Sequence, residues 1–226
     1  MLDGSQILSL LEGARITVQL FASAALLGTA LSLVFGIMGL SENRALRGFS
    51  RVYVEVARGA SAIVLLFWVR FAVPILFDID VMGPFLAGVL ALGINMGGYG
   101  AEVVRGGIQS VPLGQTEASI ALNLTIRDRL RHVILPQAVL VMLPPYGNLN
   151  IEVMKGTSLV ALIALGDLTR EAQNLRTQRV LMEDPPTTAA IFGTALVIYF
   201  VLSQVIALFY RWVEGKAGGR WYGART

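Results

Sequence analysis

The chain contains no cysteine, a single histidine and few charged residues, which make up 15% of its 226 positions. The absence of cysteine excludes disulfide bonds, thiolate metal sites and a cysteine nucleophile. No segment matches the G-x-x-x-x-G-K-[ST] loop that cradles nucleotide phosphates, and Gly215-Lys216 lacks both the upstream glycine and the following hydroxyl residue. We therefore expect a chain that hydrolyses no nucleotide itself and holds no metal or cofactor.

Apolar residues are abundant instead and make up 55% of the chain, which is typical of a membrane protein and not of a soluble domain. A helix needs about 20 mostly apolar residues to cross the hydrocarbon layer, and runs of this kind recur. We predict an all-α polytopic membrane protein with a single transmembrane domain over residues 1–226. The five predicted spans are residues 16–40, 60–77, 81–104, 133–165 and 188–210.

The distribution of Lys and Arg predicts the orientation, because cytoplasmic segments are enriched in both. With the N-terminus outside and the C-terminus in the cytoplasm, three groups fall on the inner side: Arg44, Arg47, Arg51 and Arg58; Arg105, Arg127, Arg129 and Arg131; Arg211, Lys216, Arg220 and Arg225. The outer side receives only Arg15, Arg170, Arg176 and Arg179. The net charge of +3 thus reflects topology, and we expect no nucleic-acid partner.

A polar loop over residues 105–132 separates the third and fourth predicted spans. Residues 116–122 are compatible with a helix, and Asn123 follows as a residue that tolerates the left-handed conformation. Thr125 then has the spacing of a helix cap, with its hydroxyl placed to accept the backbone N–H of Asp128. We predict two short helices that meet at a corner and form a compact knob on the cytoplasmic face.

The loop contains Glu117-Ala118-Ser119, then Asn123, and further on Val133-Ile134-Leu135-Pro136. These residues resemble the EAA loop of ABC importer permeases, with Asn123 where the family has glycine. Neighbouring segments are similar to the polar amino acid uptake subfamily: Gly100-Ala101-Glu102, Arg105 to Gln115, Leu143-Pro144-Pro145 with Gly147-Asn148, and Lys155-Gly156-Thr157-Ser158-Leu159. The resemblance extends from about Leu10 to Tyr210.

The resemblance implies the fold of a type I ABC importer permease in the bacterial inner membrane. It implies two copies of an ATP-binding subunit, a second permease chain that is identical or paralogous, and a periplasmic or lipid-anchored solute-binding protein. It also implies that segment 113–131 couples the permease to the ATPase. The contact residues would be Glu117, Ala118, Ser119, Ile120 and Ala121, with Asn123 at the corner.

Polar residues inside the apolar spans are candidates for the transport path, because such groups normally face a water-filled interior or a partner. The candidates are Asn95, Asn148, Asn150, Glu152, Lys155 and Thr157. Glu152 and Lys155 are three residues apart, so pairing with each other is an equally good interpretation. We expect Pro144, Pro145 and Gly147 to open the helix just before them.

Two further classes of membrane protein deserve comparison. Gly166-Asp167 is half of an intramembrane aspartyl protease motif, but no second aspartate follows in a span. An ATP-independent channel or ion-coupled carrier would also use polar residues in broken helices, although neither accounts for the loop from Glu117 to Pro136.

The resemblance points to polar amino acids or related zwitterions as solutes. Residues 58–68 and 147–155 are similar to the ectoine and hydroxyectoine importers within this family.

Overall fold

In the computed structural model, residues 2–78, 82–178 and 186–222 are described, with only the backbone of 218–222, and all regular elements in these ranges are helical. This confirms the predicted all-α class. The elements are α1 (Gly4–Met38), α2 (Arg44–Gly59), α3 (Ala62–Phe67), η1 (Trp68–Ala72), α4 (Val73–Phe77), α5 (Pro84–Gln109), α6 (Leu113–Ala121), α7 (Ile126–Arg129), η2 (Leu130–Ile134), α8 (Leu135–Gly156), η3 (Thr157–Ile163), α9 (Leu168–Gln178) and α10 (Thr188–Tyr222).

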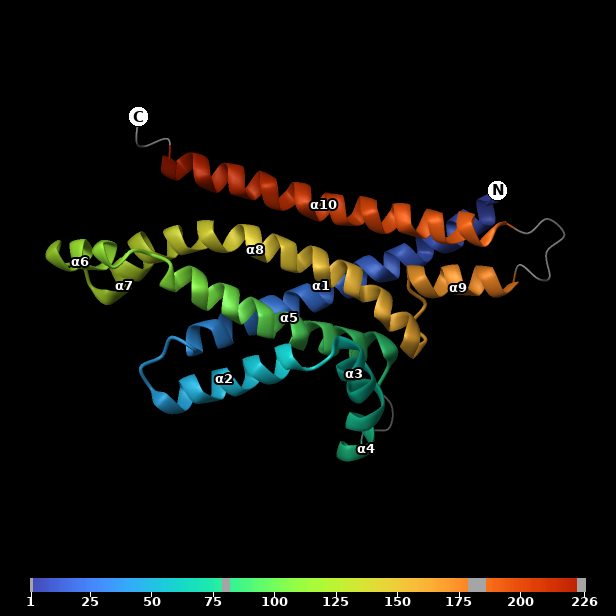
Figure 1. Ribbon diagram of the computed structural model, residues 1–226, viewed down its shortest axis with the longest axis horizontal. Helices are drawn as coiled ribbons and strands as arrows, with labels where there is room; N and C mark the ends of the chain where they lie inside the picture. The colour runs from blue at the N-terminus through green and yellow to red at the C-terminus, as the bar shows by residue number, and fades with distance from the viewer. Residues whose placement is uncertain (1, 79–81, 179–185, 223–226) are drawn as a thin grey trace.

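The long helices α1, α5, α8 and α10 run along the length of an elongated molecule (Figure 1). Helices α6 and α7 form one end, and α9 lies at the opposite end close to the N-terminus. The described C-terminal part of α10 lies toward the α6–α7 end. The predicted knob therefore lies at the end of the molecule opposite to the start of the chain.

Three single helices in the described ranges are long and apolar enough to cross a membrane: α1, α5 and α10, the last over Thr188–Ala217. Two bent pairs also meet this requirement, which makes up to five crossings. One pair is Arg44–Gly59 with Ala62–Phe77, and the other is Ile126–Ile163 with Leu168–Gln178, which are bent by 103° and 48° respectively. Some predicted features lie outside the described residues, namely the start of the third span at Val81 and the placement of Arg179, Arg225 and the Arg220 side chain.

The second crossing differs from the span predicted over residues 60–77. Residues 62–77 form three short helical segments, which reach the length of a span only together with α2. The chain turns where Ala60 and Ser61 are extended, with ψ of 135° and 130°. The segment from Arg44 to Arg58, which we expected in a cytoplasmic loop, is thus helical. The sequence did not predict this helix, because charged and apolar residues alternate along it and no long apolar run marks it.

Helix α8 also corrects an expectation. Pro144 and Pro145 lie inside a helix that continues from Leu135 to Gly156, so they do not open it before Asn148. Their rings remove two backbone donors, but the turns on either side keep the helical path. The irregular turn falls earlier, where η2 is π-helical just before Pro136. The predicted polar loop starts later than expected, because Arg105 still belongs to α5.

Helices α1 and α5 pack closely through small residues. Ala24, Gly28, Ser32 and Gly36 recur every four residues on α1, and all are buried. A side chain at Gly28 would meet Met96, since an added Cβ would lie 2.7 Å from its Sδ. The Ser32 hydroxyl donates to the Gly28 carbonyl at 2.6 Å, so this polar group is satisfied within its own helix. Small residues allow the close approach that stabilises helix pairs in membranes.

Candidate functional site

The knob at one end of the molecule begins with α6, which ends at the predicted corner. Asn123 has a φ of 56°, in the left-handed region. Its backbone N–H donates to the Ile120 carbonyl at 2.8 Å, and the N–H of Leu124 donates to the Ser119 carbonyl at 3.0 Å. These bonds satisfy carbonyls that the end of a helix would leave unpaired. The predicted role of Asn123 as the stop of this helix is confirmed.

The second helix of the knob is capped as predicted. The Thr125 hydroxyl accepts the Asp128 backbone N–H at 3.2 Å. The same hydroxyl donates to Asp128 Oδ2 at 2.6 Å, which fixes the cap from both sides. Gln137 at the start of α8 donates to Gln115 Oε1 at 3.4 Å and to the Val133 carbonyl at 2.9 Å, so α6 is linked to the helix that follows the knob.

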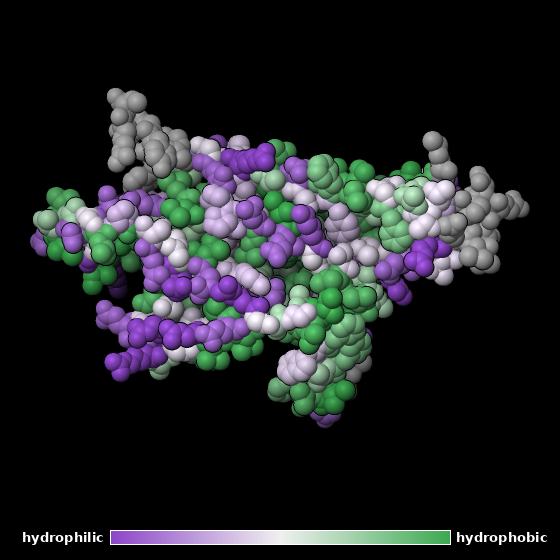
Figure 2. Space-filling view, in the orientation of Figure 1, coloured by the Kyte–Doolittle hydropathy of each residue, from purple (hydrophilic) through white to green (hydrophobic). Residues whose placement is uncertain are grey.

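The knob exposes several large apolar side chains. Leu113, Ile120, Leu122 and Ile126 are 79%, 56%, 74% and 72% exposed. Figure 2 shows hydrophobic side chains gathered at this end of the molecule. Glu117, Ala118, Ala121 and Asn123 are also exposed. Ser119 is different, because it is 2% exposed and its hydroxyl donates to the Thr116 carbonyl at 2.7 Å.

A largely apolar cavity of about 170 Å³ lies between α3, α5 and α8, and two of the predicted path residues, Asn95 and Glu152, line it. Tyr99 and Leu159 also line it. The Asn95 amide donates to the Ala57 carbonyl at 2.9 Å, so its carbonyl oxygen remains available as an acceptor. The Glu152 carboxylate is exposed. Together these groups offer acceptors to a polar solute in an otherwise apolar segment.

The structure does not bring Lys155 to Glu152. Lys155 lines a separate hollow of about 380 Å³ with Tyr199 and Phe200 of α10, whereas Glu152 faces α5. Side chains three residues apart on a helix differ by about 60° in direction, and here that difference places Glu152 against α5 and Lys155 against α10. The only salt bridge among the described residues joins Glu102 and Arg105, so the predicted alternative of a Glu152–Lys155 pair is wrong.

The other predicted path residues take structural positions or lie at the surface. Asn150 is 5% exposed and donates to the Tyr146 carbonyl and to the Tyr210 hydroxyl, both at 2.9 Å. Thr157 is fully buried, and its hydroxyl donates to the Met154 carbonyl at 2.6 Å. Asn148 is exposed. None of these three residues lines the cavity that contains Glu152.

Asp167 has a structural role that the sequence did not reveal. It is buried before α9, where its Oδ1 accepts the Arg170 N–H at 3.0 Å and its Oδ2 accepts the Thr169 N–H at 3.2 Å. The Tyr199 hydroxyl donates to Oδ2 at 3.2 Å. The carboxylate therefore caps α9 and joins it to α10. The spacing from Asp167 to Arg170, together with the glycine before it, is the sequence signal for such a cap.

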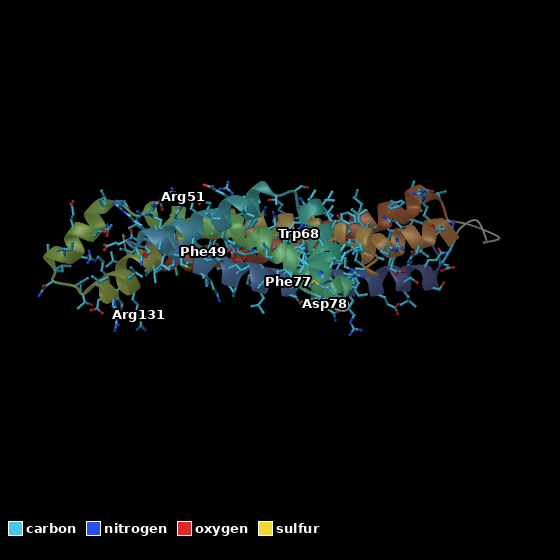
Figure 3. The ribbon with its side chains drawn as sticks, turned by 90° about the horizontal axis from the view of Figure 1, so that it is seen from below. Phe49, Arg51, Trp68, Phe77, Asp78 and Arg131 are labelled. Atoms are coloured by element: carbon cyan, nitrogen blue, oxygen red, sulfur yellow. The ribbon has the colours of Figure 1, made fainter. Side chains whose placement is uncertain are left out.

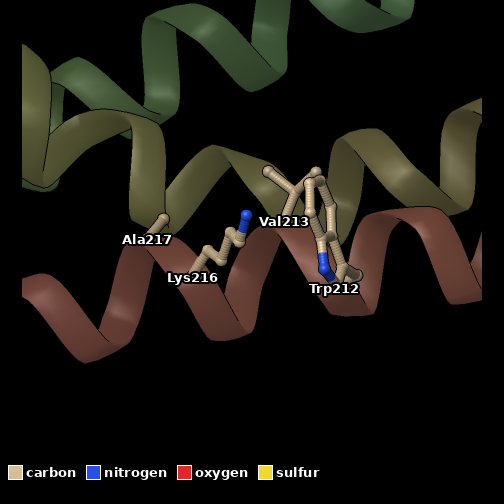
Figure 4. A pocket seen from close by; sticks show the side chains of 4 residues that line it. All are labelled: Trp212, Val213, Lys216 and Ala217. Atoms are coloured by element: carbon tan, nitrogen blue, oxygen red, sulfur yellow. The ribbon is translucent and has the colours of Figure 1, made fainter.

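A further hollow of about 600 Å³ lies toward the C-terminal part of α10 and is lined by Trp212, Val213, Lys216 and Ala217 (Figure 4). The Lys216 ammonium lies 4.2 Å from the centre of the Trp212 ring. A tryptophan beside a lysine is typical of the level at which a helix leaves the membrane. None of the predicted path residues lines this hollow, so it does not belong to the site.

The fold and the site define a class. A bundle of helices long enough to cross a membrane carries a cavity with two polar side chains, and a knob with exposed apolar side chains lies at one end. This arrangement is consistent with a membrane transport subunit that a partner contacts at the knob. Residues 18–218 match the family described as "Binding-protein-dependent transport system inner membrane component". The chain belongs to this family and is an ABC importer permease subunit of the amino acid type.

Relatives and solved structures agree with this assignment. The chain is 43% identical over 218 residues to a probable amino-acid ABC transporter permease protein, y4tF, of Sinorhizobium fredii, which covers 95% of this chain and 89% of that protein. It is 33% identical to the glutamine transport system permease protein GlnP of Escherichia coli, with 92% of each chain covered. It is 32% identical to the L-cystine transport system permease protein TcyB of Bacillus subtilis, with 90% of this chain and 84% of that protein covered.

Among solved structures, one described as an amino acid ABC transporter with histidines superposes with a TM-score of 0.83 at 29% identity and covers 96% of this chain and 99% of that chain. An inward-facing MetNI methionine ABC transporter shares the fold, with a TM-score of 0.77, 18% identity and the same coverage. In this family the ATPase is a separate subunit. The partners of this permease are therefore an ATP-binding subunit and a solute-binding protein.

Proposed function

We propose that this permease carries polar amino acids inward and that the knob transmits the motion of the ATPase to its helices. The observation that carries the coupling proposal is the exposed apolar surface around Ile120, because an aqueous surface of four large apolar side chains favours burial by a partner. Glu117, Ala118 and Ala121 lie exposed on the same helix and would enter the contact. Ser119 and Asn123 would act by shaping the knob.

The assembly follows from the family. Two ATP-binding subunits would each receive one knob, and a second permease chain, identical or paralogous, would complete the path. A periplasmic or lipid-anchored protein would deliver the solute. The knob and the C-terminus would then lie in the cytoplasm and the N-terminus outside. The start of α1 and the described end of α10 lie toward opposite ends of the molecule, which is consistent with this orientation (Figure 1). The protein itself would carry no enzymatic activity.

The solute path would include the cavity between α5 and α8. Glu152 and Asn95 are the residues for which the geometry gives most support, because they share that cavity. An exposed carboxylate would attract the ammonium group of a zwitterion, and the amide oxygen of Asn95 would add an acceptor. Lys155 lies against α10 and would not contact the solute there. Asn150 and Thr157 would hold the surrounding helices, and Asn148 would face outward.

Names of relatives support amino acids as solutes, since these include glutamine and L-cystine permeases. Ectoine or hydroxyectoine is a narrower alternative that rests only on the local resemblance at residues 58–68 and 147–155. An ATP-independent channel or carrier is the competing function. It would require neither the exposed knob nor a separate ATPase, and the membership of the importer family argues against it.

Uptake into proteoliposomes tests the proposal. Vesicles would hold this chain, its second permease and the ATPase, with ATP inside and the binding protein outside. We expect saturable, ATP-dependent uptake of a labelled amino acid from a panel that includes glutamine, cystine and ectoine. Glu117→Arg should abolish it, whereas Glu42→Arg, an equal charge reversal in the exposed connection before α2, should not. ATP-independent flux by this chain alone would overturn the proposal.

A further inference from the structure

Helix α2 carries a charged face next to the apolar segment Ala62–Phe77, with which it forms a candidate membrane crossing. Arg47, Arg51, Glu55 and Arg58 recur every three or four residues and therefore lie on one side of the helix, and all four are exposed. Helix α2 belongs to the bent pair that forms one candidate span. A charge that faces hydrocarbon costs about 3 kcal/mol or more at the membrane centre. Whether α2 enters the membrane or lies at its cytoplasmic surface, this face must meet water or a partner instead of lipid.

The other two sides of α2 are different in character. Ser50, Val54 and Ala57 are buried, and the Ser50 hydroxyl donates to the Phe35 carbonyl of α1 at 2.6 Å. Phe49 is exposed and apolar, and Figure 3 shows it on a different side of α2 from Arg51. The helix therefore has one packed side, one apolar side that suits lipid or protein, and one charged side. Only the charged side needs an aqueous surrounding.

The charged face of α2 and the end of α5 enclose a hollow of about 370 Å³. Its lining includes four arginines and two glutamates, listed with their neighbours as Gly39, Arg47, Ser50, Arg51, Val54, Glu55, Arg58, Glu102, Arg105 and Gln109. Figure 2 shows hydrophilic residues gathered along α2. The hollow therefore has an excess of two positive charges in a space that exceeds the volume of a small solute.

Some charged groups of this hollow pair with each other, and others do not. Glu102 and Arg105 neutralise each other through contacts of 2.6 and 3.3 Å, and Arg105 also donates to Gln109 at 2.8 Å. Arg51 and Glu55 form no hydrogen bond or ion pair with any described residue. Two kinds of group therefore face the hollow without a partner: a guanidinium, which suits a carboxylate, and a carboxylate, which suits an ammonium.

Arg58 joins this hollow to the cavity that contains Glu152. Its guanidinium lies 5.3 Å from the centre of the Tyr99 ring, and Tyr99 lines the Glu152 cavity. The Tyr99 hydroxyl also donates to the Arg58 carbonyl at 3.4 Å. One residue pair thus forms the boundary between the two spaces. A solute that leaves Glu152 toward the knob end would next meet the guanidinium groups of α2.

We propose that this hollow is a second, inner subsite that binds the carboxylate of the transported amino acid through Arg51 and Arg58, with Glu55 facing its ammonium group. The inference rests on the proposed function and names a later station on the same path. It has a kinetic consequence, because amino acid accumulated on the inner side would occupy the subsite and slow further import. The shared chemistry is recognition of an oxyanion, which a lipid phosphate could also supply.

Inhibition by luminal product tests the subsite. Proteoliposomes with the complete transporter would hold ATP and a series of concentrations of unlabelled amino acid inside, and uptake of label would be driven by the binding protein outside. We expect luminal amino acid to inhibit the parent and the corresponding amine, which lacks the carboxylate, not to inhibit. Arg51→Gln with Arg58→Gln should raise the half-inhibitory concentration about three- to ten-fold, as expected for the loss of charge-assisted hydrogen bonds.

Two variants control this result. Arg44→Gln removes the same charge from the first residue of α2, outside the hollow, and should leave the inhibition unchanged. Arg51→Lys with Arg58→Lys keeps the charge and should retain most of the inhibition, which separates the subsite from a folding defect. Absence of luminal inhibition in the parent, or equal inhibition in the Arg51→Gln/Arg58→Gln and Arg44→Gln variants, would overturn the subsite.

The remaining outcomes have distinct meanings. The same assay in vesicles of neutral lipid, with and without phosphatidylglycerol, identifies the source of the oxyanion. If the arginine variants differ from Arg44→Gln only in their response to phosphatidylglycerol, a lipid phosphate occupies the hollow and the amino acid assignment is overturned. Absence of ATP-driven uptake in the parent would instead contradict the proposed function, so the two failures are distinguishable.

Discussion

The side-chain amide of Asn95 on α5 donates to the backbone carbonyl of Ala57 on α2 at 2.9 Å. Ala57 lies in the last turn of α2, where carbonyls have no partner further along the helix. The next carbonyl, that of Arg58, accepts the Tyr99 hydroxyl at 3.4 Å. Two side chains of α5 thus close the end of α2 just before the chain bends by 103°.

Asn95→Leu keeps the size of the side chain and removes its donor. The Ala57 carbonyl would then lack its partner in an apolar surrounding, so we expect a loss of about 1 kcal/mol in the free energy of unfolding. The loss would appear as a lower thermal midpoint of the purified complex, together with reduced uptake because Asn95 also lines the Glu152 cavity.

Asn148→Leu is the matched control, because Asn148 is exposed on α8 and outside that cavity. Its midpoint and uptake should remain close to those of the parent. Equal losses in both variants would show that the bond to Ala57 has no particular importance.

Glu152→Gln and Lys155→Gln separate the two charges of α8. Glu152 faces the cavity shared with Asn95, so its neutralisation should lower the uptake of zwitterionic solutes about ten-fold, through the loss of one charge-assisted contact. Lys155 faces α10, so its neutralisation should leave the order of preference among solutes unchanged. Competition between labelled and unlabelled amino acids measures that order. Unchanged uptake and preference in Glu152→Gln would remove this residue from the path.

These examples show which features the sequence predicts. The corner at Asn123 and the cap at Thr125 depend on neighbouring residues alone, so local rules were sufficient. The separation of Glu152 from Lys155 depends on which helices pack on α8, and spacing along one helix does not contain that information. Helix α2 was also not predictable from local rules. Side chains of α5 fix its bend after Gly59, and its charged residues are typical of a loop.

Gly100→Ala and Gly106→Ala should shift stability in opposite directions on one helix. A Cβ at Gly100 would collide with the Ser32 hydroxyl and lie 3.2 Å from Cε2 of Tyr146, so we expect a loss of about 1–3 kcal/mol. A Cβ at Gly106 meets nothing within 4 Å, and alanine is the better helix former by about 1 kcal/mol. Thermal midpoints measured under identical conditions should fall for the first and hold or rise for the second.

The comparison also isolates packing from helix propensity, because both positions lie in α5 and both receive the same methyl group. A lower midpoint for Gly106→Ala, equal to that of Gly100→Ala, would mean that helix α5 itself resists substitution and that the contact with α1 is not the cause.

Substitutions at the adjacent residues Ser119 and Ile120 should have different effects on transport and stability, although both residues belong to the same helix of the knob. Ile120 is 56% exposed and Ser119 is 2% exposed. Ile120→Ser removes apolar surface that we propose to contact the ATPase, at a cost in folding stability below about 0.5 kcal/mol, since surface substitutions have little effect on stability. Transport should fall while the thermal midpoint of the free permease stays constant.

Ser119→Leu places a large side chain at a buried position of the knob. It should lower the thermal midpoint, because overpacking costs about 1–3 kcal/mol. Co-purification of the ATPase with each variant completes the test: loss of the ATPase in Ile120→Ser at unchanged stability supports coupling through the apolar surface, and retention of both binding and transport contradicts it.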